Sequence, residues 1–132
     1  MSLKTMEKLQ SWLSTYPDWQ ACPAKVYLLP KSMEEISRKT NVLGITQMGC
    51  RYYVTLYWEL PTLADAGDDA ERLLKFIQWV QRESAIGSVP VLGDVPSAER
   101  LRAEKGGLTP GGQTVTYTVT LVADFMKIYE VK

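Results

Sequence analysis

The sequence predicts a single α+β domain in which helices pack on one face of a mixed or antiparallel sheet. Its 132 residues correspond to one ordinary domain, and no internal repeat or linker divides the range 1–132. Residues 51–60 and 113–122 alternate apolar and polar side chains, which indicates strands with one face on a core. Between them, residues 68–84 repeat apolar side chains at three- and four-residue spacing, as an amphipathic helix does.

An earlier amphipathic helix is expected over residues 3–15, before Pro17 ends it. Its apolar stripe consists of Leu3, Met6, Leu9, Leu13 and Tyr16. Trp12 and Trp19 flank the end of this helix, and we expect them to cover one edge of the core. An aromatic clamp for a ligand is the functional alternative for these two residues.

Two extended segments follow. A short apolar run, residues 25–29, lies between two prolines and predicts a strand. Residues 31–44 are ambiguous, because residues 33–36 could open a helical turn. The later β-branched residues and Gly44 favour an extended segment that ends in a turn.

The strand over residues 51–60 is expected to stop at Pro61. One of its faces carries the core side chains Tyr52, Val54, Leu56, Trp58 and Leu60. The other face is half aromatic, with Tyr53 and Tyr57, so we expect a helix or another chain to cover part of it.

The helix over residues 68–84 has an acidic first turn and a basic last turn, as the helix dipole favours, and Gly87 is a natural stop. Its expected buried stripe consists of Leu73, Phe76, Ile77 and Val80, widened by Leu74 and Trp79. The acidic cluster Asp65, Asp68 and Asp69 raises the possibility of calcium binding. It lacks the alternating ligands and closing glutamate of an EF-hand loop, so compensation of the dipole is the preferred interpretation.

Residues 87–112 are rich in glycine and proline. A charged piece within them, residues 97–105, is expected to form a short helix or a strand with solvated charges. The glycine pairs 106–107 and 111–112 lack the strand–loop–helix context of a phosphate-binding loop. A hairpin tip or a mobile loop is therefore preferred.

The composition excludes several functions. Fifteen basic residues balance fifteen acidic ones, so the positive surplus of duplex-binding proteins is missing. The absence of histidine removes imidazole bases and histidine metal ligands. A disulfide between Cys22 and Cys50 is conceivable, but reduced thiols are preferred. With no signal peptide or membrane-spanning run in the sequence, a soluble, cytoplasmic protein is expected.

No catalytic motif is visible. Glu34 and Glu35 are adjacent, but neighbouring side chains do not converge on a strand or a helix. Nucleophile elbows, dinucleotide fingerprints and metal triads are missing. We therefore expect a non-enzymatic protein with no catalytic residue, cofactor site or metal site.

Several short runs together resemble a known family. They are Glu34–Arg38, Val42–Gly44, Arg51–Tyr53, Leu73–Val80, Gly93–Asp94, Arg102–Gly106 and Tyr117–Phe125. The resemblance is to minor capsid and minor tail structural proteins encoded in prophages of Gram-positive bacteria. In size and element order the chain is similar to the tail-terminator, or tail-completion, group of long-tailed phages. The resemblance spans about residues 3–130 and rests on packing and turn residues.

The resemblance implies a tail terminator or neck protein that forms a ring, typically a hexamer, which caps the tail tube and joins it to the head. The implied partners are further copies of the chain and the tail-tube and head-connector proteins, without a membrane or sequence-specific nucleic acid. The implied locations are the bacterial cytoplasm during assembly and then the tail or neck of the virion. No cofactor, metal or active-site residue is implied.

An alternative of another class is a small-molecule-binding α+β domain. Its aromatic pocket would be lined by Trp12, Trp19, Tyr53, Tyr57 and Trp58. A deep hollow in the monomer would favour this alternative, whereas extensive subunit contacts would favour assembly.

Strand length bears on that choice. As single strands, residues 113–130 and 45–60 would reach about 60 Å and about 50 Å, whereas a compact domain of this length has a radius of gyration of roughly 14 Å. The strands therefore either bend, at Gly49 and at Ala123–Asp124, or project as an arm that neighbouring subunits cover. The expected subunit contacts are those of residues 31–50 and of the glycine-rich loop 105–113.

Overall fold

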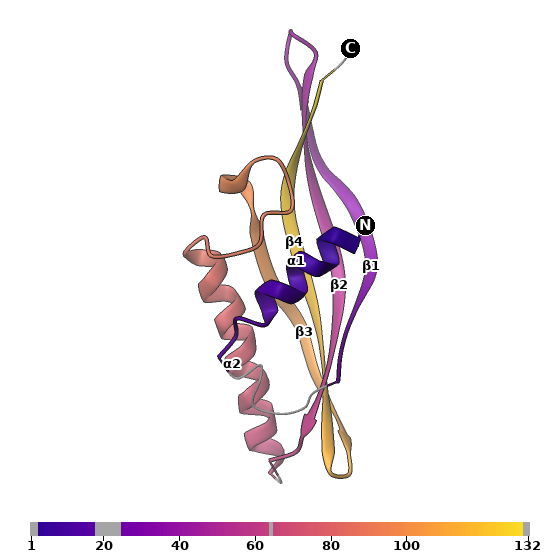
Figure 1. Cartoon of the computed structure of the whole chain (residues 1–132), viewed down its shortest axis with the longest axis vertical. Coiled ribbons are helices and arrows are strands. Elements are labelled where there is room, and N and C mark those ends of the chain that lie inside the picture. The colour runs from indigo at the N-terminus through magenta and orange to yellow at the C-terminus, as the bar shows by residue number, and fades with distance from the viewer. Residues whose placement is uncertain (1–2, 18–24, 64, 131–132) are drawn as a thin grey trace.

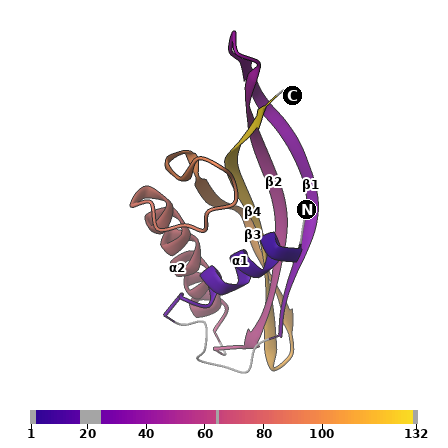
Figure 2. The same cartoon turned by 45° about the horizontal axis from the view of Figure 1, so that its top comes forward.

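In the part of the chain that the structure describes, four strands form one antiparallel sheet in the order β1-β2-β4-β3, and the two α-helices pack on the same face of it (Figures 1 and 2). The computed structural model describes residues 3–17, 25–63 and 65–130. In chain order the elements are α1 (Leu3–Leu13), β1 (Lys25–Thr40), β2 (Ile45–Pro61), α2 (Ala66–Ala85), the 3-10 turn η1 (Pro96–Ala98), β3 (Arg100–Gly111) and β4 (Thr114–Glu130). The predicted α+β class is confirmed.

An aromatic cluster fills the core between the helices and the inner face of the sheet. Trp58 of β2, Phe76 of α2 and Tyr117 of β4 are fully buried, and the Trp58 ring centroid lies 5.5 Å from that of Phe76 and 5.8 Å from that of Tyr117. Tyr16, just after α1, adds an edge-to-face contact with Phe76 at 5.3 Å. These rings join both helices to the two central strands.

The ends of α2 agree with the sequence prediction. An oxygen of the Asp65 side chain accepts a hydrogen bond from the Gly67 N–H at 2.7 Å and caps the N-terminus. At the other end Gly87 has a φ of 78°, a conformation that favours glycine after a helix.

The buried stripe of α2 is narrower than predicted. Leu73, Phe76 and Val80 are buried, and Ile77 is partly buried against the core. The prediction for Leu74 was wrong, since its side chain is 52% exposed. Successive residues of an α-helix are rotated by about 100° around its axis, so Leu74 lies beyond the edge of the stripe that Leu73 belongs to.

β1 continues far beyond the strand predicted for residues 25–29. The register shifts between Pro30 and Ser32 and again between Glu35 and Ser37. Pro30 does not end the strand, because an edge strand with a bulge tolerates a residue without an N–H. The segment 31–44 is extended and ends in a turn, as the sequence favoured.

β2 and β4 pair without interruption over their whole length, from Ile45 opposite Glu130 to Pro61 opposite Thr114. Neither Gly49 nor Ala123–Asp124 breaks a strand. Of the two alternatives, projection is therefore the one observed: the sheet extends beyond the helices (Figure 1).

The glycine-rich region forms the η1 turn and β3. Arg100 and Arg102 are exposed as predicted, but Glu99 is buried, so the expectation that all charges here are solvated was wrong. The pair Gly111–Gly112 lies at the β3–β4 hairpin. The pair Gly106–Gly107 lies instead at a register shift within β3, where a Cβ on Gly106 would approach the Ile77 side chain of α2 to 2.7 Å.

Candidate functional site

A buried polar cluster lies where β2 ends and α2 begins. The carboxylate of Asp69, which is only 4% exposed, accepts hydrogen bonds from the Thr62 hydroxyl at 2.6 Å and from the Leu63 N–H at 2.9 Å. These bonds lower the pKa of Asp69, so the side chain stays ionised. Asp69 therefore ties the first turn of α2 to the chain that leaves β2.

Arg72 extends this cluster to β4. Its guanidinium donates to the Tyr117 hydroxyl and to the Pro61 carbonyl, both at 2.8 Å, and lies 5.4 Å from the centre of the Tyr117 ring. The Tyr117 hydroxyl donates in turn to the Asp69 carbonyl at 2.9 Å, and burial raises the pKa of Tyr117. The acid, the guanidinium and the phenol thus connect β2, α2 and β4.

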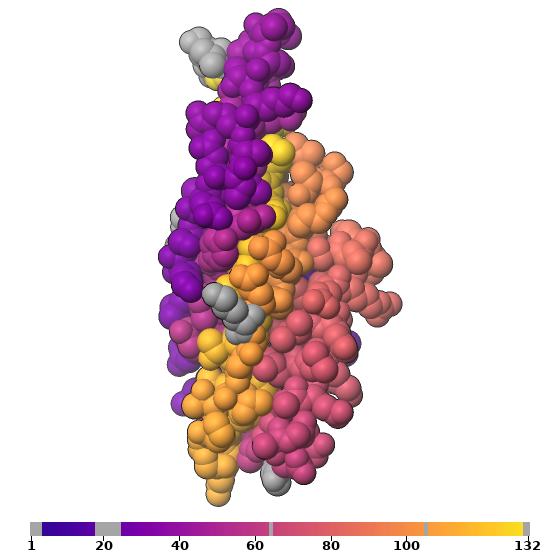
Figure 3. Space-filling view, turned by 180° about the vertical axis from the view of Figure 1, so that it is seen from behind, coloured from indigo at the N-terminus to yellow at the C-terminus, as the bar shows by residue number. Residues whose placement is uncertain are grey.

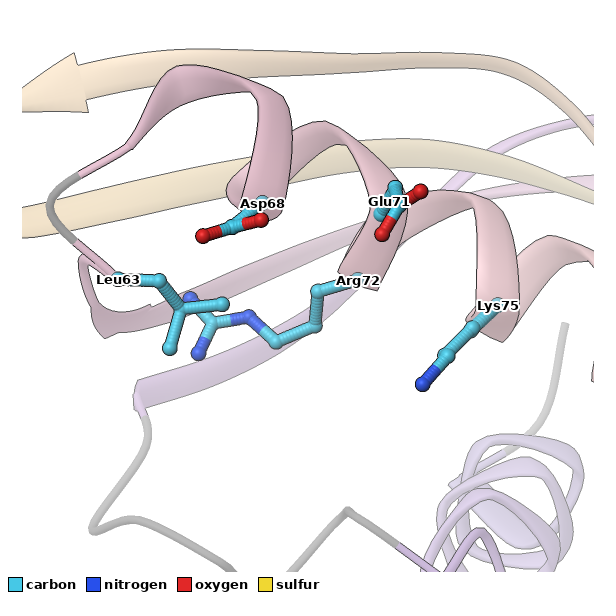
Figure 4. Close-up of a pocket in the computed structure, with 5 residues that line it drawn as sticks. All are labelled: Leu63, Asp68, Glu71, Arg72 and Lys75. Atoms are coloured by element: carbon cyan, nitrogen blue, oxygen red, sulfur yellow. The ribbon is translucent and has the colours of Figure 1, made fainter.

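A hollow of about 230 Å³ lies beside the cluster. Its lining residues are Leu63, Asp68, Glu71, Arg72 and Lys75 (Figure 4). Figure 4 shows Arg72 reaching from α2 toward Leu63, with Lys75 one turn further along the helix. Two acidic side chains balance two basic ones, so the lining has no surplus charge that would select an ion. Within the described ranges, no group of three or more acidic or cysteine side chains could hold a metal ion.

The predicted aromatic pocket does not form from the residues that the structure describes. Trp12 and Trp58 are buried on the helix side of the sheet, whereas Tyr53 and Tyr57 lie on the outer face, because successive strand residues point to opposite faces. Trp19 lies outside the described residues. Tyr57 lines only an open hollow of about 420 Å³ between the strands of the outer face.

Cys50 is a free, buried thiol, and burial raises its pKa. Cys22 lies outside the described residues, so the prediction of two reduced thiols stays a prediction for that residue.

Charged side chains cross the outer face of the sheet, which Figure 3 shows free of α1. Arg51 of β2 donates two hydrogen bonds to Asp124 of β4, at 2.7 and 3.0 Å, and Arg102 of β3 lies 3.7 Å from the same carboxylate. The Tyr53 hydroxyl donates to Glu34 of β1 at 2.9 Å, and this bond raises the pKa of Tyr53. The hydrogen bond to Asp124 likewise raises the pKa of Arg51. Side-chain contacts thus reach all four strands.

The largest uncovered feature is the arm, which we define as residues 31–49 and 126–130. It rises beyond the helices in two views of the molecule (Figures 1 and 2). Every residue from 31 to 43 is exposed. β1 forms the edge of the sheet and, among the described strands, pairs only with β2. The arm is therefore an extended surface with an open strand edge.

The tip of the arm, residues 41–44, has a fixed conformation. The side-chain oxygen of Asn41 accepts hydrogen bonds from the N–H groups of Leu43 at 2.9 Å and Ile45 at 3.1 Å, and Gly44 takes the positive φ of 82° that the turn requires. Val42 is 101% exposed and Leu43 79%. The tip thus presents two apolar side chains to solvent.

The opposite edge of the arm is partly closed. Beyond Asp124, the loop before η1 takes the place of β3: the Asp94 N–H donates to the Met126 carbonyl at 2.7 Å, and the Ile128 N–H donates to the Asp94 carboxylate at 2.8 Å. The buried Glu99 holds this loop by accepting from two of its backbone N–H groups, at 2.8 and 3.0 Å. Burial raises the pKa of Glu99, and these two hydrogen bonds oppose the shift.

Sequence reasoning found the arm as one of two alternatives and named residues 31–50 as a contact surface, but it did not single out Val42, Leu43 or Glu99. The signal for the tip was present in the sequence Asn-Val-Leu-Gly between two extended segments. Glu99 carries no such local signal. The N–H groups that it binds, those of Leu92 and Gly93, lie in an irregular loop, where no repeating spacing predicts which side chain will meet them.

No protein-family model matches this chain, and no curated protein matches it. Neither helix in the described part of the chain has both the length and the apolar character needed to cross a membrane.

Proposed function

We propose that the protein is a non-enzymatic structural protein of a phage or prophage: a tail terminator or neck protein that forms a ring, caps the tail tube and joins it to the head. The arm is the observation that carries this proposal. Its partners are further copies of the chain and the tail-tube and head-connector proteins.

The exposure of the arm supports an assembly role. Monomeric proteins avoid long uncovered strand edges and exposed apolar tips, because both invite association. Val42 and Leu43 would each contribute roughly 1.5–3 kcal/mol if a partner buried them fully. Two such anchors on a fixed turn suit insertion into a neighbouring subunit.

The buried ionisable groups support a structural role. Asp69, Arg72 and Tyr117 hold β2, α2 and β4 together, and Glu99 holds the loop beside β4. Each of them binds groups of its own chain. These contacts account for the shifted pKa values of Asp69 and Tyr117 without a catalytic task.

A ring requires head-to-tail contacts, in which one surface of a subunit meets a different surface of the next. The tip is suited to such a contact because it lies at the far end of the molecule from the β3–β4 hairpin (Figure 1). A tip inserted into the next subunit leaves that subunit's own tip available for the one after.

The test combines light scattering over a concentration series with electron microscopy of the protein alone and mixed with phage tail tubes. We expect concentration-dependent oligomers, and rings that are free or bound at tube ends. V42S/L43S should abolish ring formation while the protein stays folded. L74S removes a half-exposed apolar side chain of α2, outside the arm, and should leave the rings intact. A strictly monomeric protein that neither self-associates nor binds tubes would reject the proposal and favour ligand binding.

A further inference from the structure

We infer that the open edge of β1 binds the same edge of a second copy of this chain, in an antiparallel arrangement with two-fold symmetry. This contact is distinct from the head-to-tail contact of the proposed ring and does not depend on it. The order of the charges along the edge identifies the occupant.

The exposed edge carries two acidic residues followed by two basic ones. Glu34 and Glu35 precede Arg38 and Lys39, and all four are exposed. A second copy that runs in the opposite direction presents the basic pair where the first presents the acidic pair. Glu34 then faces Lys39 of the second copy, Glu35 faces its Arg38, and the symmetry repeats both contacts. Opposite charges on facing residues stabilise antiparallel strands.

The bulge in β1 is what makes this pairing geometrically consistent. Facing residues of an antiparallel pair must lie on the same face of the sheet, and in a regular strand Glu35 and Arg38 would lie on opposite faces. The register shift between Glu35 and Ser37 takes Ile36 out of the alternation, so Glu35 pairs with Cys50 and Arg38 with Met48. The ion pair between Glu35 and Arg38 also requires them to be on one side.

The other charge pair follows the same rule on the outer face. Glu34 pairs with Arg51 of β2, and Lys39 pairs with Gln47, two residues that share a face because they are four apart. Both cross-copy contacts are therefore between side chains on the same face. The two-fold axis passes through Ser37, which faces its own counterpart.

The same charges explain why the pairing is selective. Charged residues on an edge strand normally discourage association with other strands. Here a strand of uniform charge would make two attractive and two repulsive contacts, whereas a second copy in the antiparallel register makes four attractive ones. Continued in the same register, the pairing places Thr40 opposite Met33 of the second copy, and each tip then reaches the residues next to Leu29, which is 53% exposed.

A two-fold contact closes on itself, so it produces a dimer and not a ring. The β1–β1 dimer is therefore a state of the free protein. Sedimentation or light scattering of the full chain measures it without any phage component.

Two charge variants test the pairing. E34K/E35K makes all four positions basic, and R38E/K39E makes all four acidic. Each variant alone should be folded by circular dichroism and monomeric, with a dimer dissociation constant at least about tenfold above that of the wild type, because four opposite-charge contacts become like-charge contacts. An equimolar mixture should form a one-to-one heterodimer, since every facing pair is again opposite in charge. That heterodimer should weaken at about 1 M salt, where the Debye length is about 3 Å.

Matched controls carry the same changes of net charge on α2. D68K/E71K and K75E/R82E reverse exposed charges away from β1 and should dimerise as the wild type does. The inference would be overturned if E34K/E35K or R38E/K39E alone still dimerised like the wild type, or if their mixture stayed monomeric. Rings formed by dimer-deficient variants would leave the proposed function intact. A wild-type dimer that forms no rings, alone or on tail tubes, would remove the proposed function and keep the inference.

Discussion

β2 and β4 run through two regions with opposite burial. Under the helices, every second residue of β2 from Val54 to Leu60 is buried. In the arm, the last residues of β4, 128–130, are exposed although they remain paired with β2. The comparison teaches that side-chain burial stabilises a strand under the helices, whereas backbone pairing alone is enough to extend the same strand beyond them. Stability should therefore depend on the covered region and association on the arm.

The largest expected effect is that of a cavity in the covered region. Phe76→Ala removes a fully buried ring that contacts Tyr16 and Trp58, and should lower the free energy of unfolding by about 3–5 kcal/mol. Ile77→Ala should lie at the lower end of the range for large-to-small changes, about 2 kcal/mol, because Ile77 is only partly buried. Urea denaturation measures both. An Ile77 variant more destabilised than the Phe76 variant would contradict the burial pattern.

The junction between the two regions should show an intermediate effect. A Cβ on Gly93 would lie 2.4 Å from the Met126 carbonyl oxygen, a backbone atom that cannot turn away. Gly93→Ala should destabilise the protein by about 1–3 kcal/mol and increase hydrogen exchange at Ile128. Gly107→Ala is the matched control, since its Cβ would meet nothing within 4 Å. Equal stabilities of the two variants would mean that the loop does not pack on β4 as described.

Glu99 gives the junction a pH dependence. Because burial raises its pKa in the folded state, ionisation of Glu99 disfavours folding as the pH rises from about 4.5 through the raised pKa. Glu99→Gln places an amide N–H₂ against a backbone N–H donor at every pH, and should destabilise the protein by about 1 kcal/mol at low pH. The difference should be smaller at pH 7, because ionisation of Glu99 then destabilises the wild type. Unfolding curves between pH 4 and 7 measure the difference, with the exposed Glu7→Gln as control. A difference that grows with pH would indicate a lowered pKa instead.

The smallest effect on stability should come from the tip. V42S/L43S alters side chains that contact solvent and should change the free energy of unfolding by less than about 0.5 kcal/mol. Chemical denaturation at low protein concentration makes this comparison without association. A larger loss would show that the tip packs on its own chain, and would remove the contrast between the two regions.

Alternation and periodicity were enough to predict most of the fold. Val54, Leu56, Val119 and Leu121 are buried as their two-residue period requires. Pro30 was misread because a proline ends an interior strand but not an edge strand, and the position of a strand in the sheet is not visible locally.

The candidate site was harder to predict, because its contacts join distant parts of the chain. Arg51 and Asp124 are 73 residues apart in the sequence. The projecting arm was one of two alternatives, since strand length alone does not distinguish a bent strand from an uncovered one. The self-complementary run from Glu34 to Lys39 depends on a bulge that only the register reveals.

The order of the strands has a consequence for folding kinetics. β4 is the last strand in the chain, yet it lies between β2 and β3 in the sheet. β2 therefore gains its second neighbour only when β4 has been made, and this pairing places residue 45 opposite residue 130. Such long-range closure is slow, on a scale of milliseconds to seconds, whereas a hairpin such as β1–β2 forms in about 1–10 μs. During synthesis, the β1–β2 hairpin would therefore emerge with both of its edges unpaired. A chaperone that recognises newly made strands would meet this hairpin first.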